Sequence, residues 1–372
     1  MMKVARLAIN GYYGMGNAGD EAVLACALEQ IRRFDPSIEV TVLSGDPAAT
    51  SKMYSVKSAP RKGFGALKAI AASDLYVSGG GSLLQDATSP ASILYYLALM
   101  AASKLSGRKY AVFANGIGPV NRGWAKNMVR MACEGASSIS VRDAGSSRFL
   151  ESIGVKREDI LISADPVFAI KPRGSSEVLK AVGESSGAAA KQYLMENSGK
   201  LAVIALRNWR GLDAGSMALC SMAEALRKAG FAPVGLAFQP GYDEEPTKAA
   251  LARCGDKVPT IACSFHPEIT AGIFSLAGIT VGMRLHSLIM SAAAGVPAFG
   301  ISYDPKVDAL YEMLPLGKCV SVERLSAEGE EAMTEMLRSL DSYRGRLSGT
   351  LPAVRQRAEG ASEYMLRKAE GR

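Results

Sequence analysis

The feature that most constrains the fold is an alternation of short β-branched or aromatic runs with segments of helical periodicity. In the first half of the chain the segments between these runs, such as Glu21–Arg33 and Ser92–Leu105, place apolar residues at helical spacing. The alternation predicts a parallel sheet covered by helices on both faces. The predicted strands are Val4–Asn10, Val40–Ser44, Leu75–Ser78, Tyr110–Asn115, Ser138–Val141 and Ile160–Ser163.

A polar stretch rich in Gly, Ser, Ala and Lys, from Lys171 to about Gly199, separates this series from a second one. The second predicts strands at Leu201–Leu206, Pro233–Ala237, Val258–Ala262, Ile279–Val281 and Ala298–Ile301. We therefore expect an α/β protein of two Rossmann-like domains facing a cleft. The expected divisions are an N-terminal domain over 1–172, a connector over 173–199, a C-terminal domain over 200–325, and amphipathic helices over 326–372 that pack across the domains.

Composition narrows the class of protein. A chain of 372 residues that is 48% hydrophobic has ample core for two domains. Its apolar runs are too short to cross a bilayer and no signal-peptide layout is visible, so we expect a cytoplasmic protein. The six cysteines show no CxxC spacing, which favours buried thiols over metal ligands.

The net charge of +7 favours acidic partners, such as a phosphorylated substrate or an anionic membrane face, although solvated lysines explain it equally well. Basic residues around Trp124, over 122–130, and a second basic run over 104–109 suggest peripheral contact with the inner face of the membrane, or simply solvated basic faces. No RNA-binding motif or arginine-rich arm is present, so no nucleic-acid partner is expected.

Two glycine-rich turns follow predicted strands of the first series, where open α/β sheets bind ligands. In the first turn Asn17 either shapes the turn or binds a ligand, and Asp20 either complements the helix dipole or takes part in chemistry. In the second, Gly80, Gly81 and Ser82 offer backbone donors to a ligand or form a plain tight turn. Gln85 and Asp86 follow, and Asp86 either accepts hydrogen bonds from sugar hydroxyls or caps a helix.

Arginines also follow strands in both series. Arg142 comes directly after Ser138–Val141 and either faces the ligand crevice or pairs with Asp143. Arg207 holds the equivalent place after Leu201–Leu206 in the second series. This mirrored placement supports a ligand-binding role for both.

The most informative stretch runs from the strand Ile279–Val281 through the start of a helix. Arg284 and His286 lie at that start, where the guanidinium can clasp a carboxylate or phosphate and the imidazole can exchange a proton. A structural hydrogen bond is the alternative role for His286. Tyr303 and Lys306 follow the next strand, Ala298–Ile301, and Lys306 can add a second positive charge to an anion site.

Other polar residues near strand ends suit structural roles. Asp304 precedes a proline and suits a helix cap, and His266, also before a proline, looks like a loop or cap residue. Ser89 and Pro90 have the pattern of an N-cap followed by the first helical position.

Together the segments GYYGMGNAGDEA, SGGGSLLQD, NGIGPV, SVRD and MRLHSLIMSAAAGVPAFGISYDPKV resemble the polysaccharide pyruvyl transferase family, and within it the cell-wall enzymes of the CsaB type. The resemblance implies a glycosyltransferase-B-like fold with the acceptor on the N-terminal and the donor on the C-terminal side. It implies transfer of pyruvate from phosphoenolpyruvate, with no further cofactor, onto an N-acetylmannosamine unit as a cyclic ketal. The implied acceptor is a lipid-linked precursor of the secondary cell-wall polymer used in surface-layer anchoring.

The resemblance maps the donor-site positions onto Arg142, Arg284 and His286. Ketal formation needs an acid and a base, and we assign these roles to His286 and to Asp20 or Asp86. No cluster of metal ligands is apparent in the sequence, so we expect activity in the presence of a chelator. The alternatives are a conventional glycosyltransferase that uses a nucleotide sugar, since a fold does not fix a function, and a non-catalytic carbohydrate-binding protein.

Overall fold

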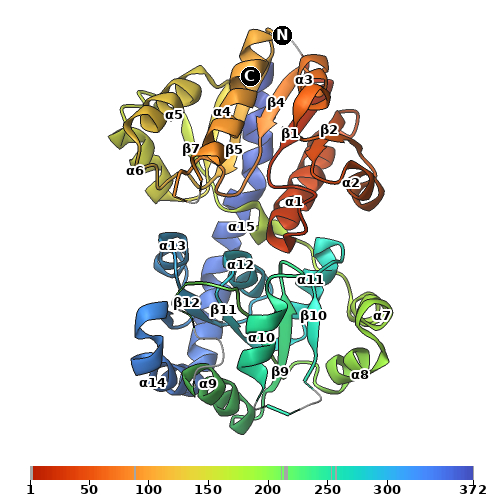
Figure 1. The fold of residues 1–372 in the computed structure, drawn as a ribbon, viewed down its shortest axis with the longest axis vertical. Helices are drawn as coiled ribbons and strands as arrows, with labels where there is room; N and C mark the ends of the chain where they lie inside the picture. The colour runs from red at the N-terminus through yellow and green to blue at the C-terminus, as the bar shows by residue number, and fades with distance from the viewer. Residues whose placement is uncertain are drawn as a thin grey trace. The chain divides into compact units, whose positions relative to one another are not determined.

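The computed structural model describes residues 3–87, 89–210, 212, 217–252, 254–255 and 258–371. The chain divides into two compact units, Met1–Ala169 with Val354–Arg372 and Ile170–Ala353. Each contains a parallel sheet between helices, as the alternation predicts (Figure 1).

The sheet of the first unit has seven strands in the order β3-β2-β1-β4-β5-β6-β7. Its strands are β1 (Arg6–Asn10), β2 (Glu39–Ser44), β3 (Lys57–Pro60), β4 (Leu75–Ser78), β5 (Lys109–Asn115), β6 (Ser138–Val141) and β7 (Ile160–Ile162). The helices are α1 (Ala18–Phe34), α2 (Pro47–Tyr54), α3 (Gly63–Ala72), α4 (Pro90–Leu105), α5 (Gly123–Gly135), α6 (Ala144–Ser152) and the 3₁₀ turn η1 (Pro166–Ala169).

The sheet of the second unit has six strands in the order β10-β9-β8-β11-β12-β13. Its strands are β8 (Leu201–Ala205), β9 (Ala232–Ala237), β10 (Thr260–Ala262), β11 (Ala277–Gly282), β12 (Ala298–Ser302) and β13 (Cys319–Ser321). The helices are α7 (Ser175–Ser186), α8 (Ala188–Glu196), α9 (Met217–Lys228), α10 (Glu244–Leu251), α11 (Pro267–Phe274), α12 (Leu285–Ala293), α13 (Pro305–Met313), η2 (Val322–Arg324) and α14 (Leu325–Arg338).

Apolar clusters cover both faces of the first sheet. One contains buried residues of α3, α4 and α5, such as Ile70, Leu97 and Val129. The other contains Leu28 of α1 together with Met365 of the last helix, α15 (Leu340–Glu370). The strands read as nearly continuous apolar runs because both faces are buried.

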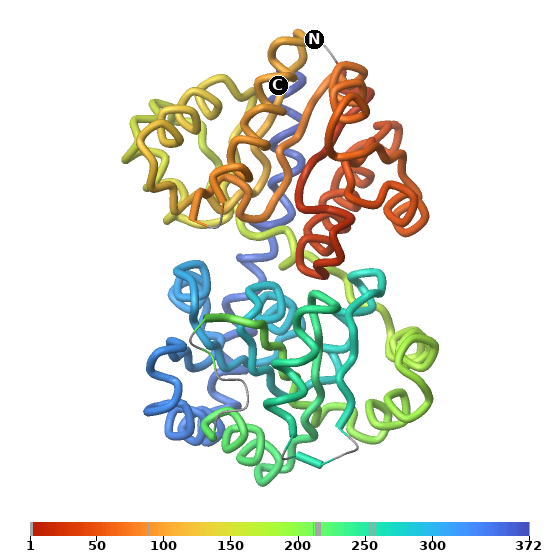
Figure 2. Tube along the Cα trace, viewed as in Figure 1, coloured from red at the N-terminus to blue at the C-terminus, as the bar shows by residue number. Residues whose placement is uncertain are grey.

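Helix α15 gives residues to both units, since the division falls between Ala353 and Val354. The predicted C-terminal helical segment therefore forms α14 and α15, and the end of α15 belongs to the unit that holds the N-terminal strands (Figure 2). Among the described residues no helix has both the length and the apolar character needed to span a membrane.

Four elements differ from the expectations. The stretch expected as a connector forms the helices α7 and α8, because Val178 and Val182, and likewise Ala190 and Leu194, recur at four-residue spacing and are buried. The two strands absent from the sequence prediction, β3 and β13, each have a single neighbour at the edge of a sheet. Their short sequences, KSAP and CVS, carry little strand signal.

Candidate functional site

The turn after β1 encloses a tyrosine. Tyr13 is fully buried, and a Cβ atom on Gly79 would lie 2.3 Å from its hydroxyl oxygen. This glycine of the turn after β4 is therefore needed to admit the Tyr13 side chain. The hydroxyl has no hydrogen-bond partner among the described residues, and burial, followed by the charges of Asp20 and Glu21, raises the pKa of Tyr13 well above its ordinary value.

Two polar residues at the start of α1 have structural roles. Asn17 caps the helix, since its side chain accepts a hydrogen bond from the backbone N–H of Gly19 at 3.0 Å. Glu21 accepts from the Gly14 N–H and from the Tyr54 hydroxyl, both at 2.7 Å, and so fixes the glycine turn. Burial raises the pKa of Glu21, and these hydrogen bonds only partly oppose it.

Asp20 is the half-buried carboxylate of the same turn. Its Oδ1 atom lies 3.2 Å from the position that a Cβ on Gly81 would take. Gly81 itself has φ of +102°, which a glycine adopts without strain, and its neighbour Gly80 packs against Val23. Asp20 therefore lies beside the second glycine turn at the carboxyl edge of the sheet.

Asp86 fixes the loop that contains Asn121 and Arg122. Its two carboxylate oxygens accept hydrogen bonds from the backbone N–H groups of Asn121 and Arg122, at 2.8 and 2.9 Å, and the Arg122 guanidinium lies 3.3 Å away. Burial opposes ionisation, yet these contacts prevail and lower the pKa of Asp86. The structure therefore favours a structural role for Asp86. The neighbouring Gln85 side chain accepts from the Ala87 N–H.

Arg142 and Ser82 meet, although they follow different strands. Arg142 is buried, donates to the Ser82 hydroxyl at 2.9 Å and forms an ion pair with Asp165 at 3.0 Å. A Cβ on Gly116 would lie 2.7 Å from the guanidinium, so this glycine makes room for it. The predicted partner Asp143 is farther, at 3.8 Å, and instead caps α6.

Arg284 makes two parallel hydrogen bonds to a carboxylate, as its position predicts, but the carboxylate belongs to the chain. Its Nε and Nη2 atoms donate to Asp243 at 2.9 and 2.6 Å, and Nη2 also donates to Gln239 at 3.2 Å. Asp243 is fully buried and also accepts from the Gln239 N–H. This edge of the guanidinium is therefore paired within the chain, and the pairing orients the start of α12.

His286 lies in the first turn of α12, as predicted. The residue is half-buried and its Nε2 atom is inaccessible to solvent. The adjacent Ser287 donates to the carbonyl oxygen of Arg284 at 2.7 Å. Because β11 lies between β8 and β12, this turn is at the same sheet edge as the residues that follow those strands.

A cationic and aromatic cluster forms after β8 and β12. The guanidinium of Arg207 lies 5.0 Å from the ring centre of Trp209 and 4.9 Å from that of Tyr303, whose hydroxyl accepts a hydrogen bond from Arg207 at 3.0 Å. The ammonium of Lys306 lies 5.3 Å from the Tyr303 ring. Lys306 also contacts Asp304 at 3.2 Å. We define Arg207, Trp209, Tyr303 and Lys306 as the Arg207 cluster.

Among the predicted cations, Arg207 differs from the others in its partners. Arg142, Arg284 and Lys306 each form an ion pair with a carboxylate. Within the described residues no carboxylate pairs with Arg207, and its Nε atom is buried without a hydrogen-bond partner. The Arg207 cluster therefore retains the capacity to bind an anion.

Sequence reasoning missed several residues of this arrangement. Asp165 and Asp243 pair with the predicted arginines from 23 and 41 positions away along the chain, so no local pattern shows them. Asp165 does follow β7 closely, and that position is the only signal available. The cap roles expected for Asp304 and His266 are confirmed.

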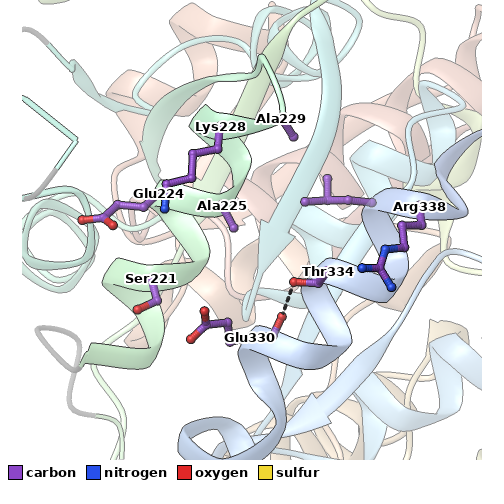
Figure 3. A pocket seen from close by; sticks show the side chains of 9 residues that line it. Ser221, Glu224, Ala225, Lys228, Ala229, Glu330, Thr334 and Arg338 are labelled. Atoms are coloured by element: carbon purple, nitrogen blue, oxygen red, sulfur yellow. Dashed lines mark hydrogen bonds between the residues drawn. The ribbon is translucent and has the colours of Figure 1, made fainter.

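A cavity of about 540 Å³ lies elsewhere, between α9 and α14 (Figure 3). Its lining includes Ser221, Glu224, Lys228, Glu330 and Arg338, none of which is a predicted site residue. Within the described residues no group of three or more His, Cys, Asp or Glu side chains is placed to hold a metal ion.

Comparison with solved structures identifies the fold. The chain superimposes on UDP-N-acetylglucosamine 2-epimerase from Neisseria meningitidis with a TM-score of 0.63 at 12% identity, covering 98% of this chain and 100% of that one. For HepE from Anabaena in complex with UDP-glucose the TM-score is 0.60 at 10% identity, over 98% of both chains. These similarities and the two parallel sheets establish a glycosyltransferase-B-like fold.

Sequence comparison identifies the family. The chain is 24% identical over 263 residues to the amylovoran biosynthesis protein AmsJ of Erwinia amylovora, covering 67% of this chain and 61% of that protein. The family model for polysaccharide pyruvyl transferase matches residues 17–305, which include the second glycine turn, Arg142, His286 and three members of the Arg207 cluster, namely Arg207, Trp209 and Tyr303. The chain therefore belongs to the polysaccharide pyruvyl transferase family.

Proposed function

We propose that the protein transfers pyruvate from phosphoenolpyruvate onto an N-acetylmannosamine residue of a lipid-linked cell-wall polysaccharide precursor, forming a cyclic ketal and releasing phosphate. Family membership supports pyruvyl transfer to a polysaccharide. The observation that carries the choice of donor is the Arg207 cluster, in which a stacked guanidinium lies beside a lysine and, among the described residues, has no carboxylate partner. The acceptor rests on the resemblance to CsaB-type enzymes.

Phosphoenolpyruvate carries a carboxylate and a phosphate, and both need compensating positive charge. The Nε donor of Arg207 is unpaired among the described residues, and its planar guanidinium matches either anion. Lys306 adds a second positive charge nearby. Arg284 contributes indirectly, because its pairing with Asp243 fixes the turn that carries His286. We therefore assign donor binding to the second unit and acceptor binding to the first.

The reaction needs protons to move in both directions. In our proposal His286 protonates C3 of the enol, so that C2 becomes electrophilic and a first sugar hydroxyl adds there and loses its proton. The C2–O bond to phosphate then breaks, and a second hydroxyl attacks C2 and loses its proton. Of the two hydroxyl protons, one balances that given to C3 and the other leaves with phosphate.

We assign the acceptor-side carboxylate to Asp20. The oxygens of Asp86 are held by two backbone N–H groups and by Arg122, whereas Asp20 lies beside the Gly81 turn at the sheet edge. Removal of a general acid or base typically slows turnover about 10²- to 10⁴-fold. His286→Ala and Asp20→Asn should therefore lose turnover on this scale, whereas properly folded Asp86→Asn should retain most of it.

The test is incubation with phosphoenolpyruvate and a panel of β-linked N-acetylmannosamine acceptors, followed by mass analysis for the pyruvyl group and by phosphate release. Arg207→Ala removes charge-assisted hydrogen bonds to the donor and should lower kcat/KM for phosphoenolpyruvate about 10- to 100-fold. Arg210→Ala, at a neighbouring exposed position, is the matched control and should leave kcat/KM unchanged.

Calorimetric titration separates this proposal from a nucleotide-sugar glycosyltransferase. Phosphoenolpyruvate should bind and UDP or GDP should not. Binding of a nucleotide with no binding of phosphoenolpyruvate would overturn the donor assignment, and absence of phosphate release with every acceptor would overturn the reaction.

A further inference from the structure

The helices α3, α4 and α5 form one layer over the first sheet. Contacts join α3 to α4 and α4 to α5, and the inner faces of all three bury residues in a single apolar cluster (Figure 1). We call the outward side of this layer the α3–α5 face. In an ordinary surface helix this side would carry charged residues.

The α3–α5 face is apolar instead. The exposed positions of α4 recur every three or four residues and include Leu94 and Leu105, and the corresponding stripe of α3 includes Phe64 and Leu67. Phe64 is 81% exposed and Leu105 is 88% exposed. On α5 the exposed apolar residues are Trp124, Met128 and Met131. Of the thirteen exposed large hydrophobic side chains among the described residues, these are seven.

The segment of the chain that contains α3, α4 and α5 is also rich in positive charge. From Pro47 to Cys133 the chain contains eleven Lys and Arg residues and two Asp residues, whereas the whole chain has a net charge of only +7. Asp86 is buried and pairs with Arg122, one of the eleven basic residues, and Asp74 pairs with Arg6, which lies outside this segment, so a large excess of positive charge remains. Helices α3 and α4 contain no acidic residue, and α5 contains only Glu134.

We propose that the α3–α5 face docks on the surface of an anionic lipid bilayer, with Phe64, Leu105 and Trp124 entering the interfacial region. Large apolar side chains bordered by lysines match the requirements of such a surface. A second copy of the same face fits poorly, because both partners would bring the same excess of positive charge. The proposal does not depend on the reaction that the protein catalyses.

Vesicle flotation tests the proposal with the full chain. The wild type should float with phosphatidylcholine vesicles that contain phosphatidylglycerol, should float poorly with pure phosphatidylcholine, and should detach as salt is raised. Because each basic residue near the surface contributes to binding, Lys68→Glu with Lys104→Glu should weaken partitioning about tenfold or more. The control Lys180→Glu with Lys191→Glu makes the same charge change on α7 and α8 and should float like wild type.

A second pair isolates the apolar contribution. Phe64→Ser with Leu105→Ser should also lose flotation, whereas Met195→Ser with Met217→Ser, at exposed positions of α8 and α9, should not. Unchanged circular dichroism establishes that each variant is folded. The proposal fails if the wild type does not float with anionic vesicles or if the variants of the α3–α5 face float like their controls. Activity on a soluble acceptor, measured in the same variants, separates this failure from failure of the proposed function.

Discussion

At the scale of single residues, the site contains buried ion pairs as well as groups that can bind a ligand. Asp243 has no exposed surface and receives two hydrogen bonds from Arg284, whose side chain is 12% exposed. Removing one member of such a pair leaves a buried charge without compensation. The two residues are therefore interdependent in the folded state.

Asp243→Ala should lower the free energy of unfolding by about 3–5 kcal/mol. The double variant Asp243→Ala with Arg284→Ala should be less destabilised than the sum of the two single variants, because neither charge is then left alone. Urea unfolding followed by circular dichroism measures all three. Glu245→Ala, at an exposed position of α10, is the control. Additive effects of the two substitutions would show that the pair is not coupled.

Asp86 allows a prediction about pH. Its folded-state pKa is lower than that of the unfolded chain, so its contribution to stability is present at neutral pH and is lost as the pH falls below about 4. Asp86→Asn should cost roughly 1–3 kcal/mol at neutral pH, and the difference from wild type should narrow on acidification. Thermal unfolding across this pH range, with the exposed Asp341→Asn as control, measures the difference. A pH-independent difference would contradict the assignment.

At the scale of elements, close packing in the glycine turns leaves no room for a side chain at certain positions. Gly79→Ala would place a Cβ atom 2.3 Å from the Tyr13 hydroxyl and should destabilise the first unit by about 1–3 kcal/mol. Adding Tyr13→Phe removes that oxygen and should restore part of the loss. Gly123→Ala, where no atom lies within 4 Å of the new Cβ, is the control for thermal unfolding. Equal stability of the Gly79 and Gly123 variants would refute the packing argument.

Most of the strands and the strand-end positions of the site are predictable from sequence. Leu75–Ser78 and Ser138–Val141 are confirmed to the residue as β4 and β6, because apolar strands with both faces buried give a strong local signal. Such strands place Arg142, Arg207 and Arg284 at sheet edges. Which arginine keeps an unpaired donor is not predictable in this way, since it depends on partners such as Asp165 and Asp243 that only the folded chain brings near.

At the scale of the whole molecule, the two series of alternating segments predict the two parallel sheets. They do not predict that α15 contributes residues to both units. The helix contains Pro352 and a largely polar sequence, so its pattern predicts an amphipathic surface helix and does not indicate which sheet it covers. Buried Ala361, Met365, Leu366 and Ala369 pack with α1 in the core of the first unit. Those partners lie more than 300 positions away along the chain.

This arrangement has a consequence for biosynthesis. The strands of the first unit leave the ribosome early, but the part of α1 that packs against Ala361–Ala369 stays uncovered until those residues have also left the ribosome. The unit that begins at the N-terminus therefore completes its core last, after the second unit has had time to fold.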